Sequence, residues 1–337
     1  MKKFSIILMA LVIISVITVF YLPGYLSASS LEAPAEVVVP KGASLSYVSE
    51  LLHSNGVIKS KLWFNYQAKA NNVDRNIKPG TYTIEPNMNL SEILQLLQKG
   101  EQAQQVVLTI PEGFTLYQIA QRVESIGLAT VDEFIASTKD YYSEKGFSFN
   151  TSKLFYELEG YLYPDTYYFN PTQTSKDIIV RMEKQMEDVF TEEYKNRAKE
   201  LNLSIHEVLT IASLVEREAY HDREMKTISG VIYNRLKQKM LLQIDATVIY
   251  AIGEGKEHIS RVLYAHLEST NPFNTYKHNG LPPGPIAAPG RKAIEAALYP
   301  EEHQFLYYVL GEKGHVFSKT YSQHQVNVKR YRSMVNN

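Results

Sequence analysis

The sequence predicts an α+β protein in consecutive parts: an N-terminal transmembrane helix, a small β-α module and a mixed α+β domain. An uncharged apolar run begins at Phe4, and a strand-turn-helix pattern occurs twice before residue 130. The second half combines amphipathic helical spacing with a proline-rich loop and short strand-like runs. The expected divisions are 1–31, 36–100, 105–200 and 201–337.

Composition excludes several functional classes. The chain has 337 residues, of which 45% are hydrophobic, and this is enough for two or three domains with their own cores. Its 35 basic and 36 acidic residues leave a formal net charge of -1, whereas a protein that binds nucleic acid normally carries a basic excess. No nucleic-acid partner is therefore expected. The absence of cysteine excludes disulfides, thiolate zinc sites and a catalytic thiol.

Residues 1–31 contain a predicted membrane anchor. Two lysines precede a run that has no charged residue from Phe4 to Leu31. About 20 apolar residues in a helix cross the hydrocarbon core of a bilayer, so residues 4–26 are long enough. Basic residues tend to stay on the cytoplasmic side, which places the rest of the chain outside the cell membrane. A cleaved signal peptide is the alternative, because "SAS" near residue 28 suits cleavage, but the length of the run favours a retained single-pass anchor.

Two segments share one pattern at a constant offset. They are "VPKGASLSYVSELLHSNGVI" from Val39 and "IPEGFTLYQIAQRVESIGLA" from Ile110. Each predicts a strand, a Pro-x-Gly turn, a Ser or Thr N-cap, an amphipathic helix and a closing glycine, and such repetition indicates a duplicated unit. With "KPGTYTIEP" and "NLSEILQLLQKG" following the first copy, residues 36–100 are expected to form a β-α-β-α module. The second copy begins segment 105–200, which continues into connecting helices.

The 36–100 module resembles LysM-type domains, which bind glycans containing N-acetylglucosamine. The resemblance is one of pattern, without a diagnostic motif. It implies glycan binding by this module. A spacer or docking domain without glycan affinity is the alternative.

From Ser175 the chain predicts long amphipathic helices. "TSKDIIVRMEKQMEDVFTEEYKNRAKELNL" carries apolar residues at helical spacing, and Ser204 is the expected N-cap of the next helix. "REMKTISGVIYNRLKQKM" predicts a further helix. Residues 271–290 hold five of the 14 prolines, which indicates a rigid loop that lines a site.

The helix expected after Ser204 ends in two glutamates, Glu216 and Glu218. Glu218 lies three positions after Val215 and four after Leu214, so these three side chains share one helix face. A carboxyl held against apolar side chains has its pKa raised and can act as a general acid near neutral pH. This spacing favours Glu218 over Glu216 as the acid, although a second group of apolar residues lies on the side of the helix toward Glu216. A solvated or ion-paired boundary position is the alternative for both.

Other catalytic or ligand-binding patterns are weaker. Asp245 begins an apolar run in "LLQIDATVIYAIG" and is either a helix N-cap or a polar residue of the site. The nine histidines show no HExxH or paired spacing, and neither a Gly-x-Ser-x-Gly elbow nor a phosphate-binding glycine loop occurs. No metal and no cofactor are expected.

Five separated motifs carry a more specific signal. They are "LEGYLYPDTYYF" (158–169), "IASLVERE" (211–218), "VIYNRLKQKMLLQIDATVIYAIG" (231–253), "NPFNTYKHNGLPPGPIAAPG" (271–290) and "HVFSKTYSQH" (315–324). In this order they resemble the endolytic murein transglycosylase family, also called MltG or YceG-like. The resemblance implies a catalytic domain core at 201–337, with 155–170 contributing, and a lysozyme-like groove.

The resemblance also implies roles for individual residues. The last residue of the family's Ala-Ser-Ile/Leu-Val-Glu-x-Glu motif is its catalytic glutamate, and it falls on Glu218. Where the family usually reads Gln-x-Asp-Pro-Thr, this chain has Ala246 in place of proline. The implied substrate-binding residues are Glu216, Asn234, Gln243, Asp245, Thr247, Tyr250, Asn274, Thr275 and Tyr276.

The activity implied is cleavage, without water, of the β-1,4 bond from N-acetylmuramic acid to N-acetylglucosamine inside peptidoglycan glycan strands. The products carry 1,6-anhydro ends, and the enzyme is expected to act on nascent strands beside peptidoglycan synthases. Two alternatives remain open. One is a hydrolytic muramidase in which Asp245 or Glu216 activates water, and the other is a membrane-anchored scaffold for wall-synthesis proteins without catalysis.

Overall fold

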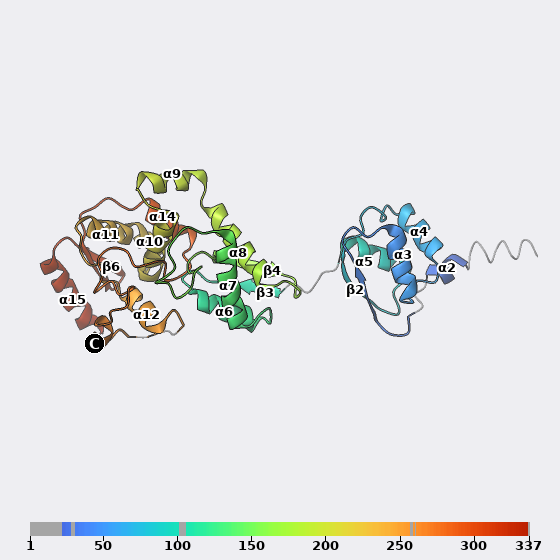
Figure 1. Ribbon diagram of the computed structural model, residues 1–337, viewed down its shortest axis with the longest axis horizontal. Helices are drawn as coiled ribbons and strands as arrows, with labels where there is room; N and C mark the ends of the chain where they lie inside the picture. Colours follow the sequence, from blue (N-terminus) through green and yellow to red (C-terminus); the bar gives the residue numbers. More distant parts are fainter. Residues whose placement is uncertain (1–21, 28–30, 101–105, 257–258, 260, 336–337) are drawn as a thin grey trace, which may run out of the picture. The chain divides into compact units, whose positions relative to one another are not determined.

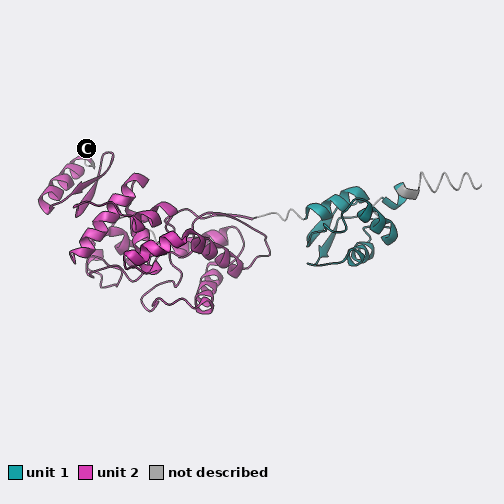
Figure 2. Ribbon diagram, turned by 90° about the horizontal axis from the view of Figure 1, so that it is seen from above, with its two compact units in different colours: residues 1–105 teal, residues 106–337 magenta. Residues whose placement is uncertain are grey.

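The protein forms two compact units, residues 1–105 and 106–337, each with its own hydrophobic core (Figure 1, Figure 2). The residues that the computed structural model describes are 22–27, 31–100, 106–256, 259 and 261–335. Within these ranges the fold is mixed α+β, with three two-stranded antiparallel sheets and many helices. The predicted α+β class is confirmed.

The first unit is a β-α-α-β-α module. Its elements are β1 (Ala35–Val39), α3 (Leu45–Ser54), α4 (Lys61–Ala70), β2 (Gly80–Ile84) and α5 (Leu90–Lys99). β1 pairs with β2, and Val48, Phe64 and Leu97, one from each helix, are buried in a single core cluster. Helix α4 is an element that the repeat pattern does not predict. Its N-cap is Ser60, whose hydroxyl accepts a hydrogen bond from the Trp63 backbone N–H.

Helix α2 (Leu22–Ser27) is the described part of the N-terminal segment. The predicted membrane span, residues 4–26, falls mostly on residues 1–21, which lie outside the described residues. Within the described ranges, no helix combines the length and apolar character needed to cross a membrane.

The second unit holds the remaining elements. They are β3 (Val106–Thr109), α6 (Leu116–Ser125), α7 (Val131–Lys145), β4 (Thr166–Phe169), α8 (Ser175–Val189), α9 (Glu192–Glu200), α10 (Ile205–Glu218), the 3-10 turn η2 (Asp222–Glu224), α11 (Met225–Lys237), α12 (Asp245–Gly253), α13 (Tyr264–Leu267), α14 (Arg291–Leu298), β5 (Tyr307–Gly311), β6 (Gly314–Ser318) and α15 (Tyr321–Val335). β3 pairs with β4 and β5 pairs with β6, both antiparallel.

Both copies of the strand-turn-helix pattern are present. In each copy the turn glycine and the glycine that closes the helix have positive φ, which side chains other than glycine rarely adopt. These angles are 80° at Gly42, 70° at Gly56, 78° at Gly113 and 75° at Gly127. The first copy completes its sheet with β2 and the second with β4, so each copy contributes to a different unit.

Helix α10 lies at the centre of the second unit (Figure 1). It packs against α14, α11 and α12, and every residue from Val208 to Val215 is buried. One continuous core cluster includes side chains from helices α6 to α12 and from α14. The predicted segments 105–200 and 201–337 therefore share a core, because this cluster holds side chains from both.

The segment 155–170 packs directly onto the proline-rich loop. Gly160 has φ 78°, and a Cβ at this position would lie 2.4 Å from Pro285 Cβ. Only glycine fits such a close approach. Beside it, Glu159 is buried and accepts hydrogen bonds from the Leu116 backbone N–H at 2.9 Å and the Tyr250 hydroxyl at 3.0 Å.

Candidate active site

The site is built on the C-terminal end of α10. The helix begins with the predicted cap: the Ser204 hydroxyl accepts from the Glu207 backbone N–H, and the Glu207 carboxylate accepts from the Ser204 backbone N–H. The predicted apolar stripe is in place, with Leu214 and Val215 fully buried. Glu218 is the last residue of the helix and follows this stripe, so its carboxyl lies at the edge of the core.

The Glu218 carboxyl is enclosed by protein, while the residue as a whole stays half-buried. The Tyr308 hydroxyl donates a hydrogen bond to Glu218 Oε2 at 2.9 Å. Burial raises the pKa of the Glu218 carboxyl above its ordinary value, and the negative charge of Asp245 adds to the rise. Tyr308, His315 and the Ala246 backbone N–H oppose this rise. The outcome is a carboxyl with a raised pKa, as a general acid requires.

Tyr308 is held by a second layer of contacts. Its ring meets the His315 ring edge to face, with centroids 5.3 Å apart, across the β5–β6 hairpin. His315 donates from Nδ1 to Glu224 Oε2 at 2.8 Å, and its backbone N–H donates to Glu224 Oε1 at 3.1 Å. Burial would raise the pKa of Glu224, but the hydrogen bonds from His315 outweigh it and the pKa is lowered. An ionised Glu224 therefore fixes the hairpin that carries Tyr308.

Glu216 lies in different surroundings from Glu218. Its Oε2 accepts a hydrogen bond from the Gly290 backbone N–H at 3.0 Å, at the start of α14. Burial and the nearby Glu112 raise its pKa, and the Gly290 bond opposes the rise. Both glutamates thus have raised pKa values, but their hydrogen-bond partners belong to different elements.

Asp245 and Tyr276 form a second polar group, which acts on Glu218 through charge. The Tyr276 hydroxyl donates a hydrogen bond to Asp245 Oδ1. Burial and this bond raise the pKa of Tyr276, and the charge of Glu218 also contributes. Asp245 is the first residue of α12 and Ile244 is the N-cap, without a side-chain bond, so the N-cap interpretation of Asp245 is wrong. Asp245 is an exposed residue, and its negative charge acts on the Glu218 carboxyl.

Thr247 and Thr275 are buried and bind each other. Their hydroxyl oxygens are 2.9 Å apart, and the Ile244 backbone N–H donates to Thr275 Oγ1 at 2.9 Å. Gln243 has φ 51°, and its backbone N–H donates to the Thr275 carbonyl at 3.1 Å. These contacts lock the start of α12 onto the 271–290 loop. They fix the position of Asp245 and leave the Gln243 side chain exposed.

Three more of the expected substrate-binding residues form hydrogen bonds that connect segments within the protein. Asn274 is fully buried and donates to the carbonyls of Leu267 and Ser269. Asn234 donates to the carbonyls of His303 and Phe305 and so joins α11 to the segment before β5. Tyr250 is buried with its hydroxyl on Glu159. The structure therefore links Glu218, Asp245 and Tyr276, and it gives these other side chains partners within the protein.

Tyr308, His315 and Glu224 are not among the site residues that the sequence predicts. Tyr308 lies in "QFLYYVL", one of the strand-like runs of the second half, and Glu224 is the second residue of the predicted helix segment that begins at Arg223, without any motif of its own. His315 begins the last of the five family motifs, which was the one available signal. Among the described residues, no three His, Asp or Glu side chains are grouped so as to hold a metal ion.

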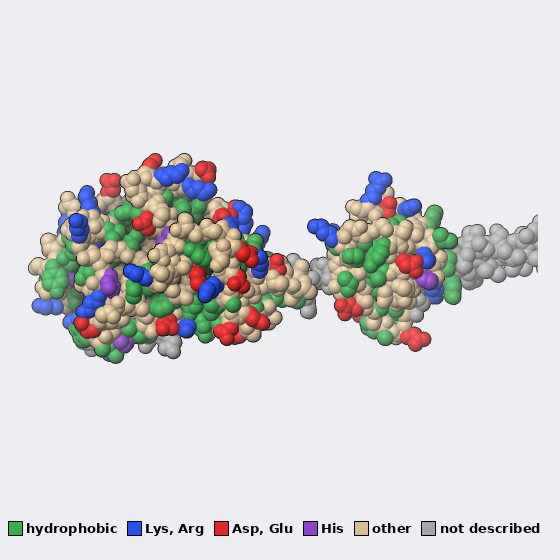
Figure 3. All heavy atoms as spheres, viewed as in Figure 1, with side chains coloured by type: hydrophobic (Ala, Val, Ile, Leu, Met, Phe, Trp, Pro, Cys, Tyr) green, Lys and Arg blue, Asp and Glu red, His purple; other side chains and the backbone are tan. Residues whose placement is uncertain are grey.

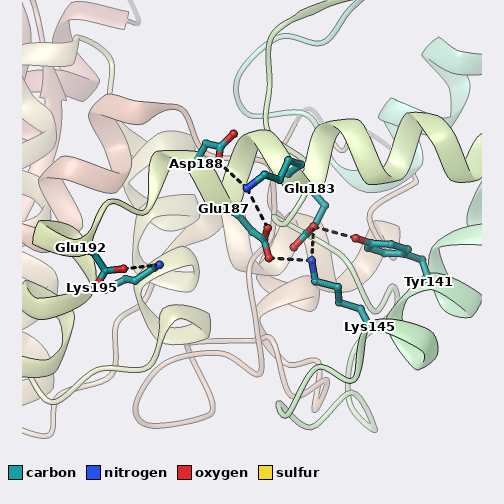
Figure 4. Close-up of polar contacts among 8 residues, drawn as sticks. Tyr141, Lys145, Glu183, Glu187, Asp188, Glu192 and Lys195 are labelled. Carbon is teal, nitrogen blue, oxygen red and sulfur yellow. Dashed lines mark hydrogen bonds and ion pairs between the residues drawn. The ribbon is translucent and has the colours of Figure 1, made fainter.

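A large cavity of about 1250 Å³ lies at the opposite end of α10. It is bordered by the ends of α7 and α8, the start of α9 and the first residues of α10. Figure 4 shows its charged rim: Lys145 binds Glu183 at 3.1 Å and Glu187 at 2.9 Å, and Lys195 binds Glu192 at 2.9 Å. A helix of 14 residues is about 21 Å long, so this cavity is separate from Glu218.

Comparison with known proteins places this geometry in context. The YceG-like family matches residues 37–330. A protein named endolytic murein transglycosylase from Bacillus subtilis is 38% identical over 310 residues, covering 88% of this chain and 85% of its own length. One of the same name from Streptococcus pneumoniae is 34% identical over 296 residues; the match covers 81% of this chain but only 53% of that protein. A crystal structure of a YceG-like protein from Listeria monocytogenes, 36% identical, superposes with a TM-score of 0.61 and covers 88% of this chain and 99% of that one.

Proposed function

Because the chain belongs to the YceG-like family, we propose that it is an endolytic murein transglycosylase. It cleaves the β-1,4 bond between N-acetylmuramic acid and N-acetylglucosamine within peptidoglycan strands, without water, and leaves 1,6-anhydro-N-acetylmuramic acid ends. The observation that carries this assignment is the enclosed Glu218 carboxyl, whose pKa is raised by burial and which has a hydroxyl donor on Oε2. Murein is also what the names of the relatives specify.

Glu218 acts first as an acid and then as a base. In its protonated form it gives its proton to the glycosidic oxygen while the bond from that oxygen to the anomeric carbon of the muramic acid breaks. The resulting carboxylate takes the proton of the C6 hydroxyl of the same sugar. The hydroxyl oxygen then closes onto the anomeric carbon, and Glu218 ends protonated as it began. The attacking hydroxyl is tethered to the substrate, so its effective concentration is high and a second carboxylate is not required.

Tyr308 assists both halves of this cycle. It donates to Oε2, so the transferable proton of the neutral acid is left on Oε1. When Glu218 is ionised, the same bond stabilises the charge. Tyr308 keeps its own proton throughout, because burial and the neighbouring Glu218 raise its pKa well above the ordinary value.

Asp245 and Tyr276 contact the glycan in this proposal. Asp245 is exposed, and its negative charge opposes loss of the Glu218 proton and favours the positive charge that develops on the sugar ring. Tyr276 orients Asp245 through its hydroxyl. Glu216, Gln243 and the buried residues behind them shape the walls of a lysozyme-like groove.

The protein is held in the cell membrane by residues 4–26, and the rest of the chain that follows this span lies outside the cytoplasm. Its first unit acts as a LysM-like module that contacts glycan, and peptidoglycan synthases supply the nascent strands that it cuts. Basic and acidic side chains are interspersed on the visible faces of the two units (Figure 3), which suits an uncharged glycan backbone better than a nucleic acid.

Digestion of purified sacculi by the wild-type chain and by Glu218→Gln tests the assignment. Mass spectrometry of the wild-type products is expected to show anhydro ends, and the nearly isosteric variant is expected to fold and release none. Glu187→Gln, a change on the remote cavity, serves as the matched control and keeps full activity. Reducing ends in place of anhydro ends would show a hydrolytic muramidase, and unchanged turnover by Glu218→Gln would remove the catalytic role.

A further inference from the structure

Helix α4 of the first unit presents an apolar and aromatic stripe to solvent. Leu62 is 84% exposed and Tyr66 is 63% exposed, and because they are four residues apart they lie on the same helix face. Lys69, three residues further on, extends this face with a basic group. The opposite face is the buried one, through Phe64 and Ala68. We name Leu62, Tyr66 and Lys69 the α4 stripe.

The start of α4 is attached to α2. The Trp63 ring N–H donates a hydrogen bond to Ser27 Oγ at 3.0 Å. Just before the helix, Lys59 donates to the Tyr25 carbonyl at 3.3 Å, and its ammonium lies 4.1 Å from the centroid of the Tyr25 ring. The two helices are neighbours in Figure 1. The α4 stripe is therefore anchored beside the last residues of the predicted membrane span and Ser27, which follows it.

The position of Ser27 fixes the level of α4 relative to a bilayer. A span of residues 4–26 has about the length that crosses a hydrocarbon core, so Ser27 falls at its outer boundary. A side chain bonded to Ser27 then lies in the headgroup region. Trp and Tyr are enriched at this level of the membrane, and long Lys side chains reach from it to the phosphates. The composition at α4, with Leu62, Trp63, Tyr66 and Lys69, matches this environment.

From this placement we infer that the α4 stripe docks on the outer leaflet of the membrane that holds residues 4–26, with Leu62 and Tyr66 inserted among the lipid headgroups. The inference rests on the membrane anchoring in the proposed function and concerns the first unit alone. Docking covers the two exposed side chains and limits how far the module can swing from its anchor.

The chain contains a single tryptophan, Trp63, so its fluorescence reports on this surface directly. The full chain is reconstituted in vesicles of phosphatidylcholine and phosphatidylglycerol, with or without bromine on the acyl carbons nearest the headgroup. Bromine quenches tryptophan only at short range. We expect at least a twofold loss of Trp63 emission in the brominated vesicles.

The variant Leu62→Glu/Tyr66→Glu distinguishes quenching that depends on docking from quenching that Trp63 shows only because it lies beside α2. The variant keeps the Trp63–Ser27 bond and removes the two side chains that insert. Quenching is expected to fall by at least half in this variant, with circular dichroism unchanged. The matched control is Tyr168→Glu, which changes a tyrosine of nearly equal exposure, 62%, in the second unit and keeps the wild-type quenching.

Each remaining outcome overturns the inference in a distinct way. A chain that does not float with vesicles refutes the anchor, and with it the docking. A chain that floats with Trp63 unquenched, or a double variant quenched as strongly as the wild type, refutes the docking alone. Emission that changes with soluble peptidoglycan fragments and not with bromine would assign the stripe to glycan instead. Release of anhydro products in detergent is measured in parallel and reports on the enzymatic assignment independently.

Discussion

Replacing Tyr308 by phenylalanine removes one hydroxyl group from the environment of Glu218 and leaves the ring in place. The hydroxyl donates to Oε2 at 2.9 Å and lowers the pKa of Glu218, because it favours the ionised form. Without this hydroxyl, less remains to counter the effect of burial and of the Asp245 charge, so the pKa of Glu218 is expected to rise. Catalysis starts from the protonated acid, and activity is lost as pH rises through that pKa. The alkaline limb of the pH profile should therefore move upward in Tyr308→Phe.

The size of the change follows from the bond that is lost. A hydrogen bond to a charged group contributes about 1.5–3 kcal/mol. Since about 1.4 kcal/mol corresponds to one pH unit, the alkaline limb is expected to move upward by about 1–2 pH units. The maximal rate is expected to fall about tenfold or more, because the carboxylate formed after the first proton transfer loses the same stabilisation.

Release of anhydro muropeptides from sacculi across the pH range, quantified by mass spectrometry, measures both effects. Tyr307→Phe is the matched control: the adjacent tyrosine directs its ring toward Arg235, 5.1 Å from the centroid, and its change should leave the limb in place. An alkaline limb that stays fixed or moves downward in Tyr308→Phe would refute the assignment of Glu218 as the acid that Tyr308 controls.

Three further changes test other parts of the structure. Ala246→Pro removes the backbone N–H that lowers the pKa of Glu218, so the alkaline limb should again move upward, by less than in Tyr308→Phe, in the same assay. Thr247→Val removes the hydrogen bond between the buried Thr247 and Thr275 hydroxyls. It should lower the free energy of unfolding by about 1–3 kcal/mol in urea titrations. Burial raises the pKa of Glu159 from 4.5 to about 8, so the native state keeps a proton that the unfolded chain has released, and stability should fall as pH rises across that window. Glu159→Gln should flatten this dependence in unfolding measured at several pH values, and an equally steep fall in the variant would contradict it.

The largest part of what the sequence determined by itself is local. The Ser204 cap, the buried stripe ending in Leu214 and Val215, and the direction of Glu218 all follow from hydrogen bonds and periodicity within one helix. The turn and closing glycines of the two repeats could also be predicted from the sequence. A positive φ restricts the residue type at its own position, so this signal is local as well. Helix α4 was missed because its apolar face is narrow, with only Phe64 and Ala68 buried.

Tertiary structure alone decided which side chains meet at the end of α10. Tyr308 comes from a hairpin about ninety residues further along the chain, and Glu224 fixes that hairpin through His315. Residue spacing along the sequence does not predict such contacts. They form only because packing of the core brings α10, η2 and the hairpin together. Packing likewise turned Thr247 and Thr275, expected to bind substrate, into a buried pair that positions Asp245, since a polar side chain enclosed by the core must bind a neighbour.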